Sequence, residues 1–114
     1  MKKINVIKKY REYKELFNLR KFKRNNLFTI YFRKNNYNIT RVGLSVSKKN
    51  GNAVTRNKIK RQVRNILDKK LTYKENYDLV IVISYKYNIN EYSKNEDSLI
   101  KLLNTLFSLG ANNE

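Results

Sequence analysis

The chain concentrates cationic and amide side chains in one segment, residues 50–64, at spacings that suit phosphate binding. Four of them follow the i, i+3, i+4 and i+7 spacing of one helical face: Asn57, Lys60, Arg61 and Arg64. Arginine can hold a phosphate through two parallel hydrogen bonds, and lysine acts as a point charge. We therefore expect this face to bind a polyanion.

Further cations lie beside the start of this face and in the loop before it. Arg56 and Lys58 flank it on the same helix, and Lys48 and Lys49 stand in the loop just before it. A merely solvated helix face usually mixes acids with bases, because pairs four residues apart stabilise the helix. No acidic residue occurs between Glu15 and Asp68. The pattern favours a binding surface over an ordinary solvated face.

Three aromatic residues could form a second surface. Tyr13 and Phe17 lie one helical turn apart, and Tyr31 lies on the outward side of an alternating strand. Exposed aromatic rings among cations can stack on unpaired bases. Rings at helical spacing also commonly belong to a core, and both interpretations remain open at this point.

The residue types for catalysis are scarce. The chain has no histidine and no cysteine, which excludes the usual general base, thiolate metal sites and Ser-His or Cys-His nucleophiles. Seven of the nine acids lie after residue 66, and no DxD-type metal motif occurs among them. A stand-alone nuclease would need acids to hold metal beside the cations, so we expect no catalytic residues and no metal bound by the protein.

The charge distribution indicates the partner. The net charge is +17, and residues 1–66 carry 20 basic and 2 acidic residues while the rest is nearly neutral. Such a density repels itself unless a polyanion neutralises it, so nucleic acid is the expected partner and an anionic membrane surface the weaker alternative. No apolar run approaches the length of a membrane span, and the expected location is the cytoplasm.

Six elements are predicted to position these residues within one domain, residues 1–114. Helical spacing favours helices over residues 9–19, 54–70 and 93–109, with Asn52 or Thr55 capping the second. Alternation predicts strands at 27–33 and 41–47, paired as a hairpin around the Asn-rich turn at 35–38, and the aliphatic run at 77–85 predicts a buried strand. The expected fold class is α+β, a small two-layer α-β sandwich in the order helix-strand-strand-helix-strand-helix.

Residues 41–67, RVGLSVSKKNGNAVTRNKIKRQVRNIL, resemble the protein subunit of bacterial ribonuclease P. The family has a strand of this form, a Gly-Asn-Ala-Val loop and an Arg-Asn-Arg helix signature followed by Lys-Arg and a further Arg. Two positions depart from the pattern: Lys58 replaces the second arginine of the signature, and Arg20 stands where the family often has glycine after its first helix.

The resemblance implies a left-handed βαβ crossover and a role in removing 5′ leaders from precursor tRNA. It implies that a catalytic RNA performs the hydrolysis with Mg²⁺ held mainly by RNA, and that one protein accompanies each RNA. The residues implied to meet the catalytic RNA are Lys48, Lys49, Arg56, Asn57, Lys58, Lys60, Arg61 and Arg64. Tyr13, Phe17 and Tyr31 are implied to hold the single-stranded leader. The alternative is a generic basic RNA-binding or ribosome-associated protein without a role in tRNA processing.

Overall fold

The computed structural model describes residues 1–112, with side chains through residue 108. Its helices are α1 (Tyr10–Leu19), α2 (Ala53–Lys70) and α3 (Tyr92–Asn112), and short 3₁₀ turns occupy Lys3–Asn5 and Lys48–Asn50. Its strands are β1 (Phe22–Arg24), β2 (Phe28–Lys34), β3 (Arg41–Val46) and β4 (Tyr77–Ile83).

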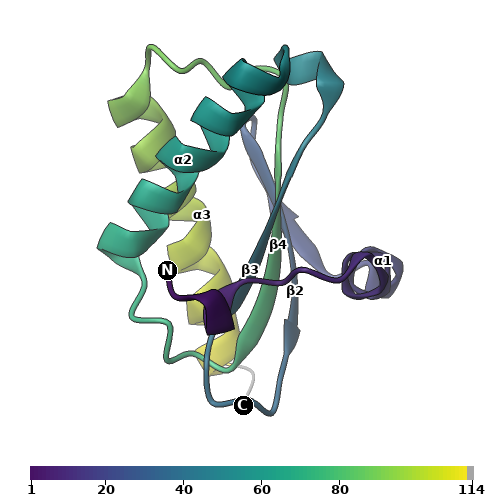
Figure 1. The fold of residues 1–114 in the computed structure, drawn as a ribbon. Coiled ribbons are helices and arrows are strands. Elements are labelled where there is room, and N and C mark those ends of the chain that lie inside the picture. Colours follow the sequence, from purple (N-terminus) through teal and green to yellow (C-terminus); the bar gives the residue numbers. More distant parts are fainter. Residues whose placement is uncertain (113–114) are drawn as a thin grey trace.

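The four strands form one mixed sheet in the order β1-β2-β4-β3. β2 runs antiparallel to β1 and β4, whereas β3 runs parallel to β4. Helices α2 and α3 cover one face of the sheet, and α1 lies against the opposite face (Figure 1). The predicted α+β sandwich is confirmed, with α1 on the face away from the two long helices.

The predicted hairpin between residues 27–33 and 41–47 is wrong. Both strands exist, but β4 lies between them and pairs with each. The reason is the apolar character of β4 on both sides: Leu79 and Ile81 face the main core, while Val80 is buried on the α1 side. A strand that is apolar on both faces is most stable at the centre of a sheet. Strand β1, only three residues long, was not predicted.

The segment β3–α2–β4 forms the crossover that the resemblance implies. Parallel neighbours require such a crossover, and α2 provides it. Figure 1 shows β3 in front of β4 with both strands rising and α2 to their left, which makes the crossover left-handed. This is the rare hand for a βαβ unit.

The main core fills the space between the sheet and the two long helices. On α2 it takes Ile59, Val63, Ile66 and Leu67, the apolar face that the spacing predicts. A smaller cluster under α1 contains Ile7, Leu16 and Val80. The small cluster therefore fixes α1 on the sheet.

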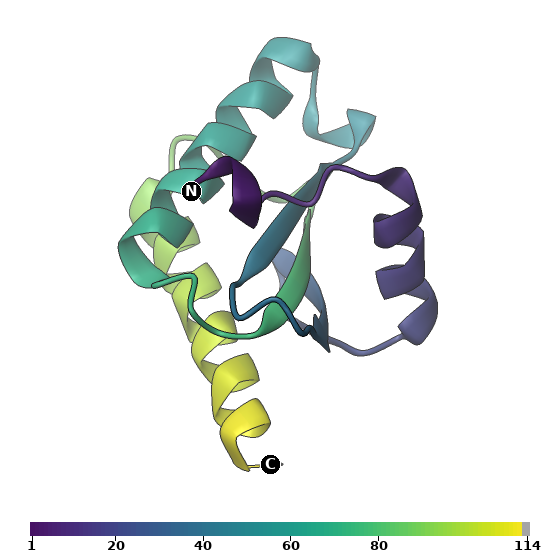
Figure 2. The same ribbon diagram turned by 60° about the horizontal axis from the view of Figure 1, so that its bottom comes forward.

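The N-terminal segment crosses the edge of the sheet. It runs from beside α2 over β3 to the start of α1 (Figures 1 and 2). Val6 forms a parallel bridge with Val42, and the Ile7 N–H donates to the Val42 carbonyl at 2.9 Å. The segment thereby connects the two layers and covers part of the free edge of β3.

Candidate nucleic-acid interface

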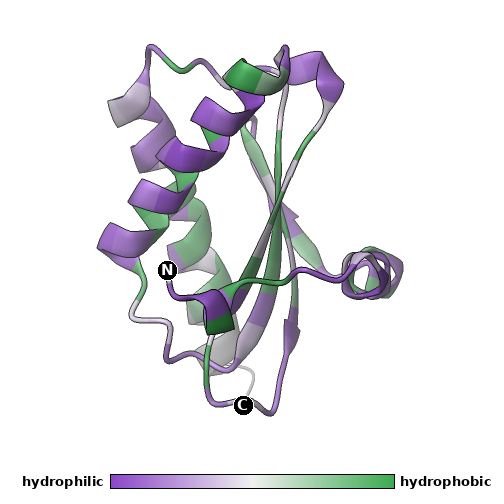
Figure 3. Cartoon of the chain, in the orientation of Figure 1, coloured by the Kyte–Doolittle hydropathy of each residue, from purple (hydrophilic) through white to green (hydrophobic). Residues whose placement is uncertain are grey.

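Helix α2 begins where the sequence indicates and separates its apolar from its cationic residues. The Asn52 side chain caps the helix by accepting a hydrogen bond from the Thr55 N–H at 2.9 Å. Most of the α2 ribbon is hydrophilic (Figure 3). The four buried residues of the helix, Ile59, Val63, Ile66 and Leu67, all belong to the main core, whereas Val54 in the first turn is exposed. The division predicted from spacing is present in the structure.

The predicted phosphate-binding residues differ in exposure. Arg56 and Lys60 are half-buried, whereas the other six are exposed: Lys48, Lys49, Asn57, Lys58, Arg61 and Arg64. Within the described part of the chain, none of the α2 cations from Arg56 to Arg64 forms an ion pair with an acid. Their charges remain available to an external anion.

Tyr13 lies over Gly43 of β3. A Cβ at Gly43 would come within 2.5 Å of the Tyr13 hydroxyl oxygen, so the close approach requires glycine. The hydroxyl donates to the Ile7 carbonyl at 3.2 Å, and burial raises the pKa of the Tyr13 phenol although the Leu44 backbone and the Arg64 charge oppose it. The Tyr13 ring is therefore half-buried, and its contacts with Gly43 and Ile7 fix its position.

The other two predicted aromatic residues lie on the same side of the sheet. Phe17 and Tyr31 meet edge to face with ring centroids 4.9 Å apart, and both are half-buried against the small cluster. Phe22 of β1 extends this group, because it pairs with Tyr31 in register and its ring lies 5.3 Å from the Tyr31 ring. We call Tyr13, Phe17, Phe22 and Tyr31 the aromatic strip.

Sequence reasoning missed Phe22. The ring is 41% exposed, and residues 22–24 form too short a strand to show an alternating pattern. The only available signal was an aromatic residue between cations, in KFKR.

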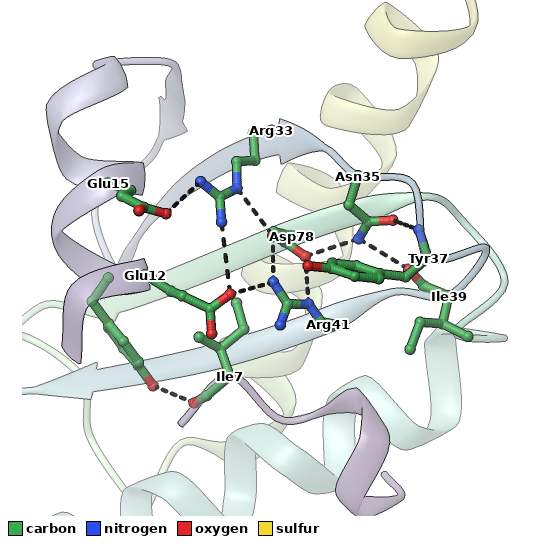
Figure 4. A network of polar contacts seen from close by, with 10 residues as sticks. Ile7, Glu12, Glu15, Arg33, Asn35, Tyr37, Ile39, Arg41 and Asp78 are labelled. Atoms are coloured by element: carbon green, nitrogen blue, oxygen red, sulfur yellow. Dashed lines mark hydrogen bonds and ion pairs between the residues drawn. The ribbon is translucent and has the colours of Figure 1, made fainter. Parts of the chain in front are cut away.

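A network of charges fastens α1 to the sheet beside the aromatic strip (Figure 4). The buried Asp78 carboxylate of β4 accepts two hydrogen bonds from Arg41, at 2.9 and 2.8 Å, and one from Arg33 at 3.0 Å. The two arginines in turn bind Glu12 and Glu15 of α1, at 2.6 and 3.1 Å. The only two acids in residues 1–66 are thus paired with structural arginines, and they do not offset the cations of α2.

The same network shifts the ionisation of its members. Burial alone would raise the pKa of Asp78, but hydrogen bonds from Arg41, Asn35 and Arg33 lower it overall. The hydrogen bond to Asp78 raises the pKa of Arg41 despite its burial. The network is a charged, hydrogen-bonded unit at neutral pH.

The described residues include no group of three or more side chains able to hold a metal ion. No helix among them combines the length and the apolar character needed to span a membrane. The candidate functional surfaces among the described residues are therefore the cationic side of α2 and the aromatic strip.

Comparison with known proteins decides the family. A family model described as ribonuclease P matches residues 1–106. The chain belongs to the ribonuclease P protein family. Ribonuclease P protein components similar to it include that of Mesoplasma florum, 42% identical over 90% of this chain and 96% of the relative. Another, from a strain of Clostridium botulinum, is 41% identical over 89% of this chain and 93% of the relative.

Solved structures of the family share the fold. The ribonuclease P protein of Staphylococcus aureus matches with a TM-score of 0.76 and 28% identity, covering 90% of this chain and 94% of that one. The protein of Thermotoga maritima matches with a TM-score of 0.74 and 28% identity, covering 86% of this chain and 94% of that one. As a ribonuclease P protein component, the chain is part of an endoribonuclease and serves the 5′ maturation of tRNA.

Proposed function

We propose that this ribonuclease P protein binds the catalytic RNA of the enzyme through α2 and holds the 5′ leader of precursor tRNA on the aromatic strip. The RNA performs the hydrolysis, and one protein accompanies each RNA. The observation that carries this proposal is the placement of α2 cations beside half-buried aromatic rings. Among the described residues, the cations from Arg56 to Arg64 pair with no acid, and Lys60 and Arg64 lie beside Tyr13.

The exposed side of α2 and the loop before it suit a folded RNA. Lys48 and Lys49 lie in the 3₁₀ turn that precedes α2, so the two cationic groups are continuous along the chain. Binding there would release counterions from the RNA, which supplies much of the free energy of protein–RNA association. Asn57 can donate to and accept from sugar or base edges.

The aromatic strip suits an unpaired strand. Its rings lie on the open face of the sheet beside α1, and each ring can stack on a base without reading its identity. Stacking on a single-stranded leader would therefore provide affinity without reading its sequence.

Magnesium belongs to the RNA in this proposal. The protein contributes cations that offset repulsion between the phosphates of the two RNAs, and this reduces the concentration of Mg²⁺ that the RNA needs. The chain's own residues bind and orient, and none of them moves a proton.

Reconstitution tests the proposal. The protein is mixed with ribonuclease P RNA and precursor tRNA, and cleavage is followed while Mg²⁺ is lowered. We expect no cleavage by the RNA-free protein, and cleavage by the mixture at Mg²⁺ concentrations where the RNA alone is inactive. Cleavage by nuclease-free protein without RNA would contradict this division of labour.

A further inference from the structure

The cations of α2 form two rows that point in different directions. Arg56, Lys60 and Arg64 recur every four residues and define an inner row along the helix. Lys58 and Arg61 define an outer row, because they lie about 160° and 100° around the helix from Lys60. Both outer residues are exposed, whereas Arg56 and Lys60 of the inner row are half-buried.

Two residues of the inner row, Lys60 and Arg64, line a notch between α2, β3 and α1. Lys60 and Arg64 border a cavity of about 170 Å³ together with Tyr13 and the Gly43–Leu44 backbone. The N-terminal segment closes the cavity on one side through Val6 and Ile7. The cavity has room for a phosphate group but not for a whole nucleotide.

The inner row as a whole, from Arg56 one turn before the notch to Arg64 within it, provides cations without anions. Among residues 1–108, no acid pairs with the inner row, and the Arg56 Nε is buried without a hydrogen-bond partner. Buried donors in native proteins are almost always satisfied, so an unsatisfied one in a binding surface indicates a group supplied by a ligand. The group that satisfies several cations at once is an anion.

The notch is also continuous with the aromatic strip, since Tyr13 belongs to both. A single strand of RNA presents bases on one side and phosphates on the other. A strand with its bases on the strip would reach the edge of β3 at Tyr13. There it would meet Lys60 and Arg64 of the inner row. Successive residues of that row rise by about 6 Å along the helix, near the spacing of phosphates in an extended strand.

We propose that the two rows bind different RNAs: Arg56, Lys60 and Arg64 hold phosphates of the precursor's leader, and Lys58 and Arg61 hold the catalytic RNA. This rests on the proposed function and divides the α2 surface that it treats as one. Helix α2 thereby aligns the leader directly against the RNA that cleaves its junction.

Matched variants on the same helix test the division. Lys60→Ala is compared with Lys58→Ala, and Arg64→Ala with Arg61→Ala, each verified as folded by circular dichroism and thermal unfolding. Two affinities are measured: the protein for ribonuclease P RNA, and the assembled enzyme, at saturating protein, for precursor tRNAs with long, short and no leader.

The inner-row variants are expected to weaken binding of long-leader precursor about fivefold each, as one solvent-accessible ion pair implies. The slope of log affinity against log salt should fall by about 0.7 for each phosphate contact removed from a single strand. Affinity for mature tRNA should be unchanged. The outer-row variants should weaken binding of the catalytic RNA and spare the leader dependence.

Two outcomes would overturn the division. If all four variants weaken only the binding of the catalytic RNA, α2 is a single surface and the proposed function still stands. If the inner-row variants weaken binding equally with and without a leader, the row contacts the body of the tRNA. Unchanged affinity for both RNAs in all four variants would instead remove the proposed function itself.

Discussion

Gly43 shows how one residue without a side chain positions another with a large one. The Tyr13 ring occupies the space where a Cβ would lie, and its hydroxyl reaches the Ile7 carbonyl. Gly43→Ala should therefore displace the ring and lower the free energy of unfolding by about 1–3 kcal/mol through overpacking and a lost hydrogen bond. Urea unfolding measures the loss.

A double-mutant cycle controls this prediction. In a Tyr13→Ala background the alanine at position 43 has no ring to displace, so its cost should nearly vanish. An equal cost in both backgrounds would mean that Gly43 is required by the strand itself rather than by Tyr13.

Asp78 should make stability depend on acidity. Its folded-state pKa is lowered, so it binds a proton less readily when folded than when unfolded, where the pKa is about 3.9. Its contribution to stability is present above that value and is lost as the pH falls through the lowered folded pKa. Asp78→Asn should cost about 3 kcal/mol at neutral pH, because Arg33 and Arg41 lose their shared counter-ion.

Unfolding free energies measured from pH 7 to pH 2 test this. The variant should lose less stability on acidification than the unaltered protein. Asp97→Asn, at an exposed position on α3, provides the control and should leave the acid dependence unchanged. If the Asp78 variant lost as much stability on acidification as the unaltered protein, other carboxylates would account for the acid dependence.

At the scale of elements, the turn after α1 carries a strained residue. Arg20 adopts the left-handed conformation, with φ 55° and ψ 28°, and ends the helix by donating its N–H to the Phe17 carbonyl. Non-glycine residues in this conformation cost about 1–2 kcal/mol relative to glycine, which in turn loses more entropy on folding. Arg20→Gly should therefore stabilise the protein by up to about 1 kcal/mol.

Thermal unfolding of Arg20→Gly and of Asn38→Gly separates this cause from others. Asn38 has a similar φ of 58°, but asparagine tolerates that region, so its replacement should gain less. A loss of stability in Arg20→Gly would mean that the arginine side chain contributes contacts that outweigh the strain.

The elements were more predictable than their pairing. Apolar spacing placed α2 at 54–70, against Ala53–Lys70 in the structure, because a long amphipathic helix buries one continuous face. The same reasoning found β2 and β3 but joined them as a hairpin. Alternation shows which residues face a core but does not show which strand lies next. β4 lies between β2 and β3 because both of its faces are apolar, one packing in the main core and the other in the small cluster under α1.

The candidate site was likewise predictable within single elements and not between them. The cations of α2 were identified from spacing alone, since a helix fixes their directions. The close approach of Tyr13 to Gly43, the role of Phe22 and the pairing of Arg33 and Arg41 with Asp78 all join residues distant in sequence. Such contacts exist only once the strand order is known.

At the scale of the whole molecule, the two faces of the sheet differ in what they carry. One face holds the main core and carries α2 with its cations, while the other face leaves the aromatic strip accessible beside α1. The charge network fastens α1, which carries Tyr13 and Phe17, to strands β2, β3 and β4. On the proposed function, the protein adds a leader-binding surface to a catalytic RNA.

Binding of precursor tRNA to the RNA alone and to the assembled enzyme, across leaders of decreasing length, tests that claim most directly. The affinity gained from the protein should grow with leader length and vanish for mature tRNA. Tyr31→Ala should remove about 1–3 kcal/mol of that gain, one stacking contact, and leave the affinity for the catalytic RNA unchanged. A gain of the same size at every length, including no leader at all, would contradict the account.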